Sequence, residues 1–524
     1  MQNFFRPLST RWRTIQLCLS VALLFSLSTS LGGAAETKRP AANWEHSVVQ
    51  IDIKRKNYDF LLPWTTPLHN AQKYGVVLSD HEILTTAESL DDRTLLRVQK
   101  DGRGKWFAAQ VSWIDYIANI ALLAVDEAAF WTDMVPVELA NPVPTGDAIQ
   151  IVRWRNGKLE NRRADFNQFN VEDAKLSWVQ YLQIELNSEI NGAGWSEPAI
   201  SGGKVIGLIC SQNGNSCKAI PSSFIRSILD AQKKGSYRGL GYFDFVWQIS
   251  ENPTTFKYLK FDGGEQRGVV VIDVPEKKSA PGPIRPRDII LQVDGFDIDN
   301  TGDYKDPDYG HVLLENLATR NKWAGDNVRI KISRDGKTLD LDYKLPKVDV
   351  SAKLVPEGHF DQPPEYLLLG GLVFQPLETD FLRSWGGDWR RRAPFRLSYY
   401  NNQPPTPERP SLVLLSQVLP DAFNLGYQEY RYLVVDTVNN EKISKLEDIK
   451  RALQKPIDGY HVIKFQKGDS LQKIILDAGE QEGATQRVLS RYGIEKDHFF
   501  VDQSVAQASA TPGKSASAAK AADH

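Results

Sequence analysis

The sequence carries almost no net charge, contains few cysteines and has no long apolar run after its first 35 residues. Its 524 residues have a formal net charge of −2, so the overall charge favours neither nucleic acid nor an acidic membrane surface as a partner. Hydrophobic content of 41% and charged content of 24% are ordinary for a globular protein. A chain of this length predicts about three or four domains.

The single long apolar run lies at the N-terminus. Arg6, Arg11 and Arg13 precede "IQLCLSVALLFSLSTSL", and the small residues "GGAA" follow. This order predicts a signal peptide over residues 1–35, cleaved after Ala35, and therefore an exported protein, periplasmic if the source is Gram-negative. An uncleaved membrane anchor is the alternative, but the run is slightly short for a span. No other run is long enough, so we expect no transmembrane segment after cleavage.

Cysteine is scarce: the chain has three, and Cys18 lies in the leader. Cys210 and Cys217 flank "SQNGNS", in which Asn213-Gly214 is a hairpin signal between two strand-like runs. In an oxidising compartment the two thiols would face each other across such a hairpin, which predicts a disulfide, with two free thiols as the alternative. With no further cysteine and no histidine close by, a metal site here is not supported.

Helical periodicity is also scarce before residues 222–234, "SSFIRSILDAQKK". The preceding part from Asn43 consists of short β-branched runs separated by turns. The runs are "SVVQIDI", "YGVVLS", "EILTTA", "TLLRVQK", "ALLAV", "IQIVRW" and "VIGLIC". This pattern predicts a β-barrel or sandwich domain over residues 43–234, closed by one helix.

Two further units follow, over residues 236–346 and 347–497. Each repeats one order: a glycine-bearing strand, a second strand, a hairpin rich in Asp or Asn, a helix and a terminal hairpin. This is an imperfect internal repeat. The remaining residues, 498–524, form a tail whose low complexity from about residue 502 predicts disorder.

Several motifs of the first domain resemble the HtrA/Deg family of serine proteases with PDZ domains, most closely the plant Deg proteins with a divergent second PDZ domain. The motifs are "HEILTTAESL", "ANIALLAV", "INGAGWSEP", "VIGL" and "AIPSSFI". The resemblance covers residues 43–497. It implies a mainly β fold, with a chymotrypsin-like double β-barrel followed by two PDZ-like α+β domains. It also implies a homo-oligomer.

The three positions that would carry the catalytic triad in this resemblance are all replaced. Glu88 stands at the histidine position, Asn119 at the aspartate position and Trp195 at the serine position. A carboxylate is a poor base for an alcohol at neutral pH, an amide cannot stabilise an imidazolium, and an indole has no nucleophilic atom. The tryptophan ring would also fill the space that a substrate's acyl carbon needs. These replacements predict that the chain is no enzyme, although the family resemblance alone would classify it as a serine endopeptidase.

The loop has also lost the glycines that aim backbone N–H groups at an oxyanion. Ala193, Ser196 and Glu197 stand in their places. A one-residue shift would bring Ser196 into the nucleophile slot, but it misaligns the flanking motif and restores neither histidine nor aspartate. A metal site built from Glu88, Asp80 and His81 is a further possibility, but the spacing matches no known ligand pattern and favours a solvated turn. We therefore expect no metal and no cofactor.

The PDZ-like units retain the features of peptide binding. PDZ domains add a peptide strand to a sheet edge and capture its terminal carboxylate with the N–H groups of a glycine-bearing loop. In the first unit this loop is Gly239-Leu240-Gly241-Tyr242, followed by the hairpin motif "RPRDIILQVDGFDI", in which Arg287 replaces a glycine. In the second unit the loop is Gly370-Gly371-Leu372-Val373-Phe374. For the second unit we expect a structural groove, or one occupied by the chain itself.

The sequence thus predicts a catalytically inactive exported scaffold, chaperone-like binder or regulator. It would hold peptides or unfolded proteins through its PDZ domains and dock on active HtrA relatives. A serine endopeptidase that acts through unrecognised groups is the first alternative, and a structural component of an envelope complex is the second. Tryptophan, tyrosine and arginine are enriched in "RSWGGDWRRRAPFRLSYY", within the second unit. These residues would form either an interface with another protein or a packing surface within the chain.

Overall fold

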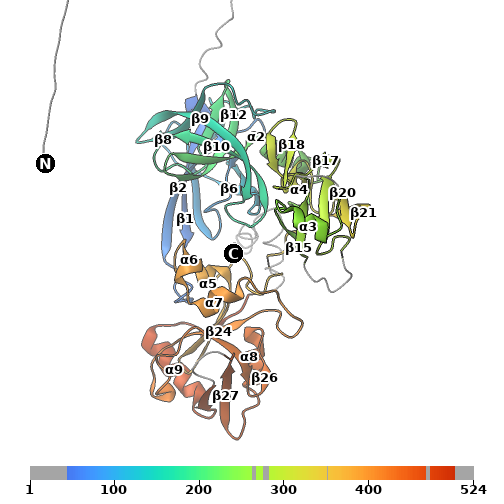
Figure 1. The fold of residues 1–524 in the computed structure, drawn as a ribbon. Coiled ribbons are helices and arrows are strands. Elements are labelled where there is room, and N and C mark those ends of the chain that lie inside the picture. The colour runs from blue at the N-terminus through green and yellow to red at the C-terminus, as the bar shows by residue number, and fades with distance from the viewer. Residues whose placement is uncertain (1–43, 263–266, 275–281, 351, 468–472, 502–524) are drawn as a thin grey trace, which may run out of the picture. The chain divides into compact units, whose positions relative to one another are not determined.

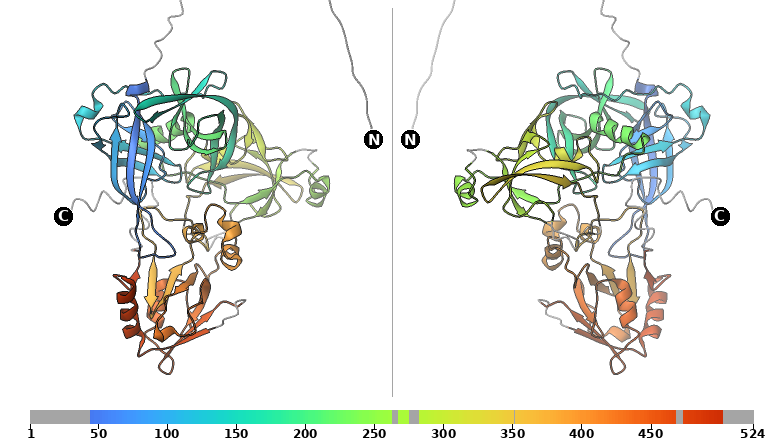
Figure 2. Two further views of the ribbon diagram at one scale, coloured as in Figure 1. Left: turned by 90° about the vertical axis from the view of Figure 1, so that its left-hand side faces the viewer. Right: turned by 90° about the vertical axis from the view of Figure 1, so that its right-hand side faces the viewer.

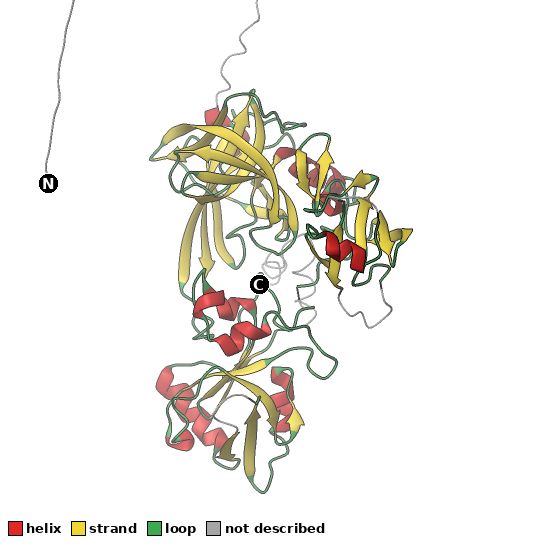
Figure 3. Cartoon of the chain, in the orientation of Figure 1, coloured by secondary structure: helices red, strands yellow, loops and turns green. Residues whose placement is uncertain are grey.

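Strands dominate the chain (Figure 3). The computed structural model describes residues 44–262, 267–274, 282–350, 352–467 and 473–501. The predicted leader with Cys18, and the tail beyond residue 501, lie outside these ranges. The mainly β fold predicted from the sequence is confirmed.

The first domain begins with a seven-stranded antiparallel sheet in the order β5-β4-β1-β2-β3-β7-β6 (Figure 1). Its elements are η1 (Trp44–His46), β1 (Val48–Lys56), β2 (Leu68–Val77), β3 (Ile83–Thr85), β4 (Arg93–Gln99), β5 (Phe107–Ala108), β6 (Gln110–Asp115), β7 (Ile120–Ala124) and α1 (Ala128–Trp131). Short β-branched runs such as "VVQIDI" form these strands because such side chains suit a pleated, buried surface.

A closed barrel in the order β10-β13-β12-β11-β8-β9 follows. Its elements are β8 (Ile149–Arg155), β9 (Lys158–Asp173), β10 (Gln180–Ser188), β11 (Pro198–Ser201), β12 (Lys204–Asn213), β13 (Ser216–Pro221) and α2 (Ser222–Lys233). Helix α2 buries Phe224, Ile225, Ile228 and Leu229, the spacing of an amphipathic helix, in a core that both sheets share.

The predicted hairpin at Asn213-Gly214 is confirmed by β12 and β13, but the predicted disulfide is wrong. Cys210 and Cys217 are both free and buried. Cys217 lies opposite Gln212, whereas Cys210 falls in a bulge of β12 and packs in a different hydrophobic cluster from Cys217. The turn residues are Gly214 and Asn215, which place Cys217 opposite Gln212, two residues from Cys210, so the two side chains do not meet across the ladder.

The first PDZ-like region contains a sheet in the order β14-β15-β16-β20-β21, and β17 pairs with β16. Its elements are β14 (Val246–Gln248), α3 (Pro253–Tyr258), β15 (Val269–Asp273), β16 (Ile289–Val293), β17 (Phe296–Asp297), β18 (Asp303–Asp306), β19 (Gly310–Leu313), α4 (Asn316–Thr319), β20 (Asn327–Arg334) and β21 (Lys337–Lys344). Within the described ranges β14 pairs with β15 alone, so one of its edges has no strand partner.

The second PDZ-like region contains a sheet in the order β28-β27-β25-β24-β23-β22-β29, and β26 pairs with β25. Its elements are β22 (Tyr366–Leu369), β23 (Leu372–Pro376), α5 (Thr379–Arg383), α6 (Trp389–Arg392), α7 (Phe395–Tyr400), β24 (Val413–Val418), η2 (Ala422–Asn424), β25 (Leu433–Val438), β26 (Glu441–Lys442), α8 (Leu446–Ala452), β27 (Tyr460–Phe465), β28 (Lys473–Asp477), α9 (Gln481–Tyr492) and β29 (His498–Phe499). Helix α9 packs against β22 and β23 through Val488. Figure 2 shows the C-terminal part of the chain from two further sides.

Three further observations complete the description of the fold. Strand β29 shows that paired structure continues through Phe499, so the predicted start of the tail at residue 498 is too early. In the ranges that the structure describes, no helix has both the length and the apolar character that a bilayer crossing needs. The same ranges hold no cluster of three His, Cys, Asp or Glu residues arranged to bind a metal.

Candidate functional site

Three loops of the first domain bring the predicted triad positions together. Glu88 follows β3, Asn119 precedes β7, and Trp195 lies between β10 and β11. The Glu88 N–H donates a hydrogen bond of 3.0 Å to Asn119 Oδ1. The Thr86 N–H donates one of 3.0 Å to Ser196 Oγ, which ties the third loop to the first. The positions inferred from sequence motifs therefore form one site.

Glu88 and Asn119 are held by contacts within the protein. The ammonium of Lys175 lies 3.0 Å from Glu88 Oε1, and Lys175 also donates to the Cys210 carbonyl. Asn119 is fully buried and adopts a φ of 55°. Its Nδ2 has no hydrogen-bond partner among the described residues. Asn119 thus positions the backbone of residue 88 but adds no charge to the site.

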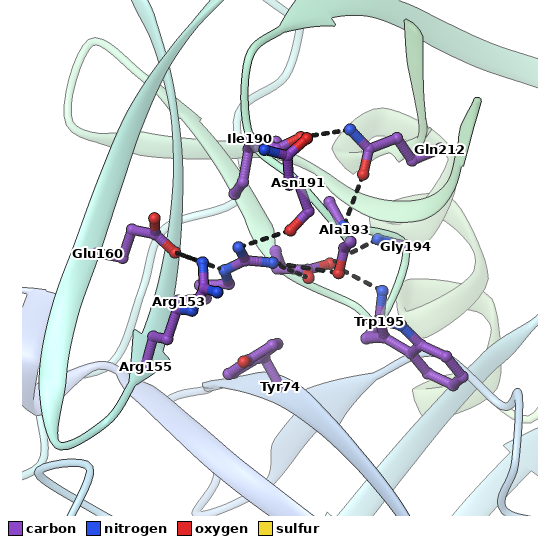
Figure 4. Close-up of polar contacts among 12 residues, drawn as sticks. Tyr74, Arg153, Arg155, Glu160, Ile190, Asn191, Ala193, Gly194, Trp195 and Gln212 are labelled. Atoms are coloured by element: carbon purple, nitrogen blue, oxygen red, sulfur yellow. Dashed lines mark hydrogen bonds and ion pairs between the residues drawn. The ribbon is translucent and has the colours of Figure 1, made fainter. Parts of the chain in front are cut away.

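The loop between β10 and β11 directs its backbone N–H groups at side chains of this same chain. Gly194 and Trp195 donate to Glu197 Oε2, over 3.0 and 2.8 Å (Figure 4). The Ala193 N–H donates to Gln212 Oε1 over 2.7 Å. Although the loop has lost glycines, its N–H groups still converge, and a carboxylate oxygen occupies the point where two of them meet. Glu197 itself is fully buried.

Arg153 on β8 anchors this loop through hydrogen bonds to its backbone. Its guanidinium donates to the carbonyls of Gly192 and Asn191, over 3.1 and 2.8 Å, and to Glu160 Oε2 over 2.8 Å. Its Nη1 also lies 3.6 Å from Glu197 Oε1, and Figure 4 shows it between Glu160 and Asn191. Burial raises the pKa of Glu197, while the two N–H groups and Arg153 oppose that increase.

Trp195 does not enter the core as we expected. Its side chain is 37% exposed, and Figure 4 shows the indole directed away from Arg153. The loop is anchored through the backbone instead, because the Tyr74 N–H donates to the Trp195 carbonyl over 2.9 Å. The Glu197 carboxylate, rather than the indole, fills the space inside the loop.

Lys73 on β2 is a member of this site that the sequence motifs did not reveal. It is fully buried, and its Nζ donates to Thr86 O, Thr86 Oγ1 and Glu88 O over 2.5, 2.7 and 2.8 Å. Burial lowers its pKa from 10.5 to about 7. The alternation of inward and outward residues along β2 could have revealed Lys73, because Ala71 and Lys73 share the inward face.

The loop predicted to capture carboxylates in the first PDZ-like region is packed against its own chain. Gly239 has a φ of 88°, and its carbonyl accepts the Ala324 N–H. Leu240 is only 1% exposed, and a Cβ on Gly241 would lie 2.8 Å from Leu345. Tyr242 is half-buried. The open edge of the sheet begins further along the chain, at β14.

The corresponding loop of the second PDZ-like region is a tight turn between two paired strands. Gly370 and Gly371, with φ values of 54° and 96°, form a two-residue turn, and Leu369 pairs with Leu372 across it. The following residues, Leu372, Val373 and Phe374, lie in β23, which pairs with β22 on one edge and with β24 on the other. Both edges of β23 are therefore paired within the chain, as expected for a structural groove or one occupied by the chain itself.

Comparison with known proteins identifies relatives of both halves of the chain. A PDZ domain family model matches residues 355–499. The chain is 24% identical over 456 residues to "Putative protease Do-like 13" of Arabidopsis thaliana, covering 86% of this chain and 87% of that protein. It is 25% identical over 424 residues to "Protease Do-like 4, mitochondrial" of the same plant, covering 78% and 77%.

Among solved structures, "HtrA-type protease AlgW with decapeptide" is 17% identical to this chain. The match has a TM-score of 0.42 and covers 58% of this chain and 96% of that one. The sequence relatives extend through the first domain and the PDZ-like regions alike. Over most of its length the chain is therefore similar to Do-like proteases of the HtrA/Deg family, and residues 355–499 match a PDZ domain.

Proposed function

We propose that this chain is a catalytically inactive HtrA-like protein that holds peptides or unfolded segments of other proteins as a scaffold, chaperone-like binder or regulator. The basic, apolar and small-residue order of residues 1–35 supports export. Replacement of all three triad positions supports the loss of catalysis. The observation that carries the proposal is the contact of Glu197 with the loop N–H groups.

An acyl-transfer site stabilises a developing negative charge with N–H groups that are free until the substrate arrives. Here the N–H groups of Gly194 and Trp195 already bind Glu197 Oε2. Glu197 is fully buried and is held by Arg153, so a substrate carbonyl would have to displace an internal ion pair. Restoring the triad side chains alone would leave this obstacle in place.

The alternative of a serine protease acting through other groups rests on Ser196 and Lys73. A lysine with a lowered pKa can serve as the base for a serine. However, the Lys73 ammonium already donates to Thr86 and to the Glu88 carbonyl, and Ser196 is fully buried with its Oγ bonded to the Thr86 N–H. The contacts favour a structural role for both residues.

Peptide binding is supported best at β14 in the first PDZ-like region. An edge strand can accept a further strand through its backbone, and nearby apolar side chains give affinity. Val246 and Ile249 are 51% and 54% exposed, which leaves apolar surface beside that edge. In the second PDZ-like region the strand that follows the glycine turn, β23, offers no such edge, because it pairs with β22 and β24.

The catalytic part is tested with unfolded casein and a fluorophosphonate probe. We expect neither cleavage nor labelling by the wild-type chain. The triple variant Glu88→His, Asn119→Asp and Trp195→Ser should also stay inactive, and its matched partner adds Glu197→Gly to clear the N–H groups. Cleavage by the wild type, or probe attached to Ser196, would overturn the proposal. Activity of the triple variant alone would show that the Glu197 contact is no obstacle.

The binding part is tested by fluorescence anisotropy with peptides that end in an apolar residue, and by suppression of aggregation of an unfolded protein. Val246→Asp should weaken binding about tenfold, because it places a charge beside the open edge. Ile475→Asp is the control, since Ile475 is similarly exposed on the edge strand β28 of the second region. Absence of binding in both assays would favour a structural component of an envelope complex.

A further inference from the structure

An arginine- and aromatic-rich surface lies on α6 and α7, within the insertion between β23 and β24. It comprises Arg390, Arg391, Arg392, Phe395 and Tyr399, hereafter the arginine–aromatic surface. Phe395 is 79% exposed and Tyr399 is 50% exposed. Phe395 has the greatest exposure of any large hydrophobic residue in the described ranges. The triad site and the peptide-binding edge do not use any of these residues.

The fold determines which side chains of these two helices face solvent. Trp389 and Leu397 are buried in one apolar cluster that also contains residues of α5 and β24. Phe395 and Tyr399 are four residues apart on α7, and their ring centroids lie 6.0 Å apart. Side chains at this spacing share one helix face. Packing of the inner residues therefore holds the two exposed rings on the outer face.

The surface is strongly basic although the chain as a whole is not. Residues 388–400 contain four arginines and one aspartate, a net charge of +3, whereas the whole chain has −2. Arg390 lies over the Trp389 ring at 4.5 Å. Within the described part of the chain, Arg390, Arg391 and Arg392 form no ion pair, whereas Arg383 of α5 pairs with Asp380.

We propose that the arginine–aromatic surface docks the protein on an anionic lipid bilayer. Phenylalanine and tyrosine rings are favoured at the level of the lipid headgroups, and clustered arginines next to them attract anionic lipids. Phe395 and Tyr399 would enter the interface, and Arg390, Arg391 and Arg392 would pair with lipid phosphates.

Two features favour a bilayer over an acidic protein as the occupant. The rings project from short helices, and neither Phe395 nor Tyr399 lines the cavity beside α5 and α8. The arginines are consecutive, so their long side chains can spread over many lipid phosphates without the fixed geometry that paired carboxylates need. An acidic protein remains an outcome that the experiment detects.

The test is co-sedimentation of the full chain with vesicles of phosphatidylcholine alone, or with about 30 mol% phosphatidylglycerol. We expect binding that needs phosphatidylglycerol and falls when salt rises from about 0.05 to about 0.5 M. The variant Arg390→Gln, Arg391→Gln and Arg392→Gln should lower the partition coefficient about a hundredfold, at about fivefold per charge. Phe395→Ser with Tyr399→Ser should lower it about tenfold.

The matched control is Tyr258→Ser with Arg287→Gln, which removes another exposed aromatic–arginine pair, in the first PDZ-like region. This control should bind vesicles as the wild type does, and circular dichroism should show all variants folded. Equal binding to both vesicle types, or full binding by either surface variant, would overturn the proposal. Binding to poly-glutamate without binding to vesicles would also overturn it and would assign the surface to an acidic protein.

Discussion

Replacing Glu197 by alanine should loosen the loop between β10 and β11. The carboxylate accepts the N–H groups of Gly194 and Trp195, and both would lose their partner in a buried place. Each unpaired buried donor costs about 1–3 kcal/mol. Arg153 loses its contact with Glu197 but keeps Glu160 and two carbonyls, so it adds less. We expect the loop's opening free energy to fall by about 3 kcal/mol in total.

Hydrogen exchange followed by mass spectrometry is the appropriate assay, because unfolding of a chain with several domains is not two-state. A loss of about 3 kcal/mol corresponds to roughly a hundredfold faster exchange in the peptide that covers residues 191–198. Glu197→Gln keeps an acceptor oxygen but places an NH2 group near Arg153, so it should cost about 1–2 kcal/mol.

Two controls test whether the effect is specific to Glu197 and confined to this loop. Glu408→Ala removes an exposed carboxylate and should leave exchange in this loop unchanged. Strand β24 should exchange alike in all variants. If Glu197→Ala changed exchange of the loop by less than threefold, the N–H groups would have other partners, and the account of the occupied loop would be refuted.

Three further outcomes follow from other contacts. Between pH 8 and 9 the unfolding free energy of the wild type should rise by about 1 kcal/mol. The pKa of Lys73 is lowered to about 7 in the folded chain, so the unfolded chain binds more protons than the folded chain in this window. Lys73→Met should flatten that slope in thermal melts. Cys210 and Cys217 should not react with a thiol reagent in the native protein, since burial raises their pKa to about 12 and about 11, yet both should react after denaturation without reductant. Gly371→Ala should lower the unfolding free energy by about 2–4 kcal/mol, because its φ is 96° and the new Cβ would lie 2.3 Å from a carbonyl oxygen. Gly387→Ala is the control and should lower it by less than about 0.5 kcal/mol, because open space surrounds that position.

The sequence predicted the elements whose hydrophobic pattern is local and strong. The helix at residues 222–234 and the hairpin at Asn213-Gly214 are both present, because amphipathic spacing and an Asn-Gly pair act within a few residues. The meeting of Glu88, Asn119 and Trp195 also followed from the motifs. These features depend on short segments, and the family resemblance predicts where each segment lies in the fold.

Features that depend on register or on distant partners were not predicted correctly. The turn falls at Gly214 and Asn215 rather than one residue earlier, so Cys217 lies opposite Gln212 and not Cys210, and cysteine spacing alone does not reveal this register. Gly370-Gly371 between two apolar runs is also a hairpin signal, and the resemblance to a carboxylate-binding loop outweighed it. The Glu197 contact could not be foreseen, because it depends on where Arg153 and two backbone N–H groups lie in space.

The hairpin of β22 and β23 has a consequence for how this protein can respond to its surroundings. Strand β22 is joined to β23 by two residues, so its effective concentration at that edge far exceeds that of any free peptide. A free peptide would have to displace β22 to pair with this edge of β23. At this edge the backbone pairing that a PDZ domain can offer to a partner strand contributes instead to the folding of the chain itself.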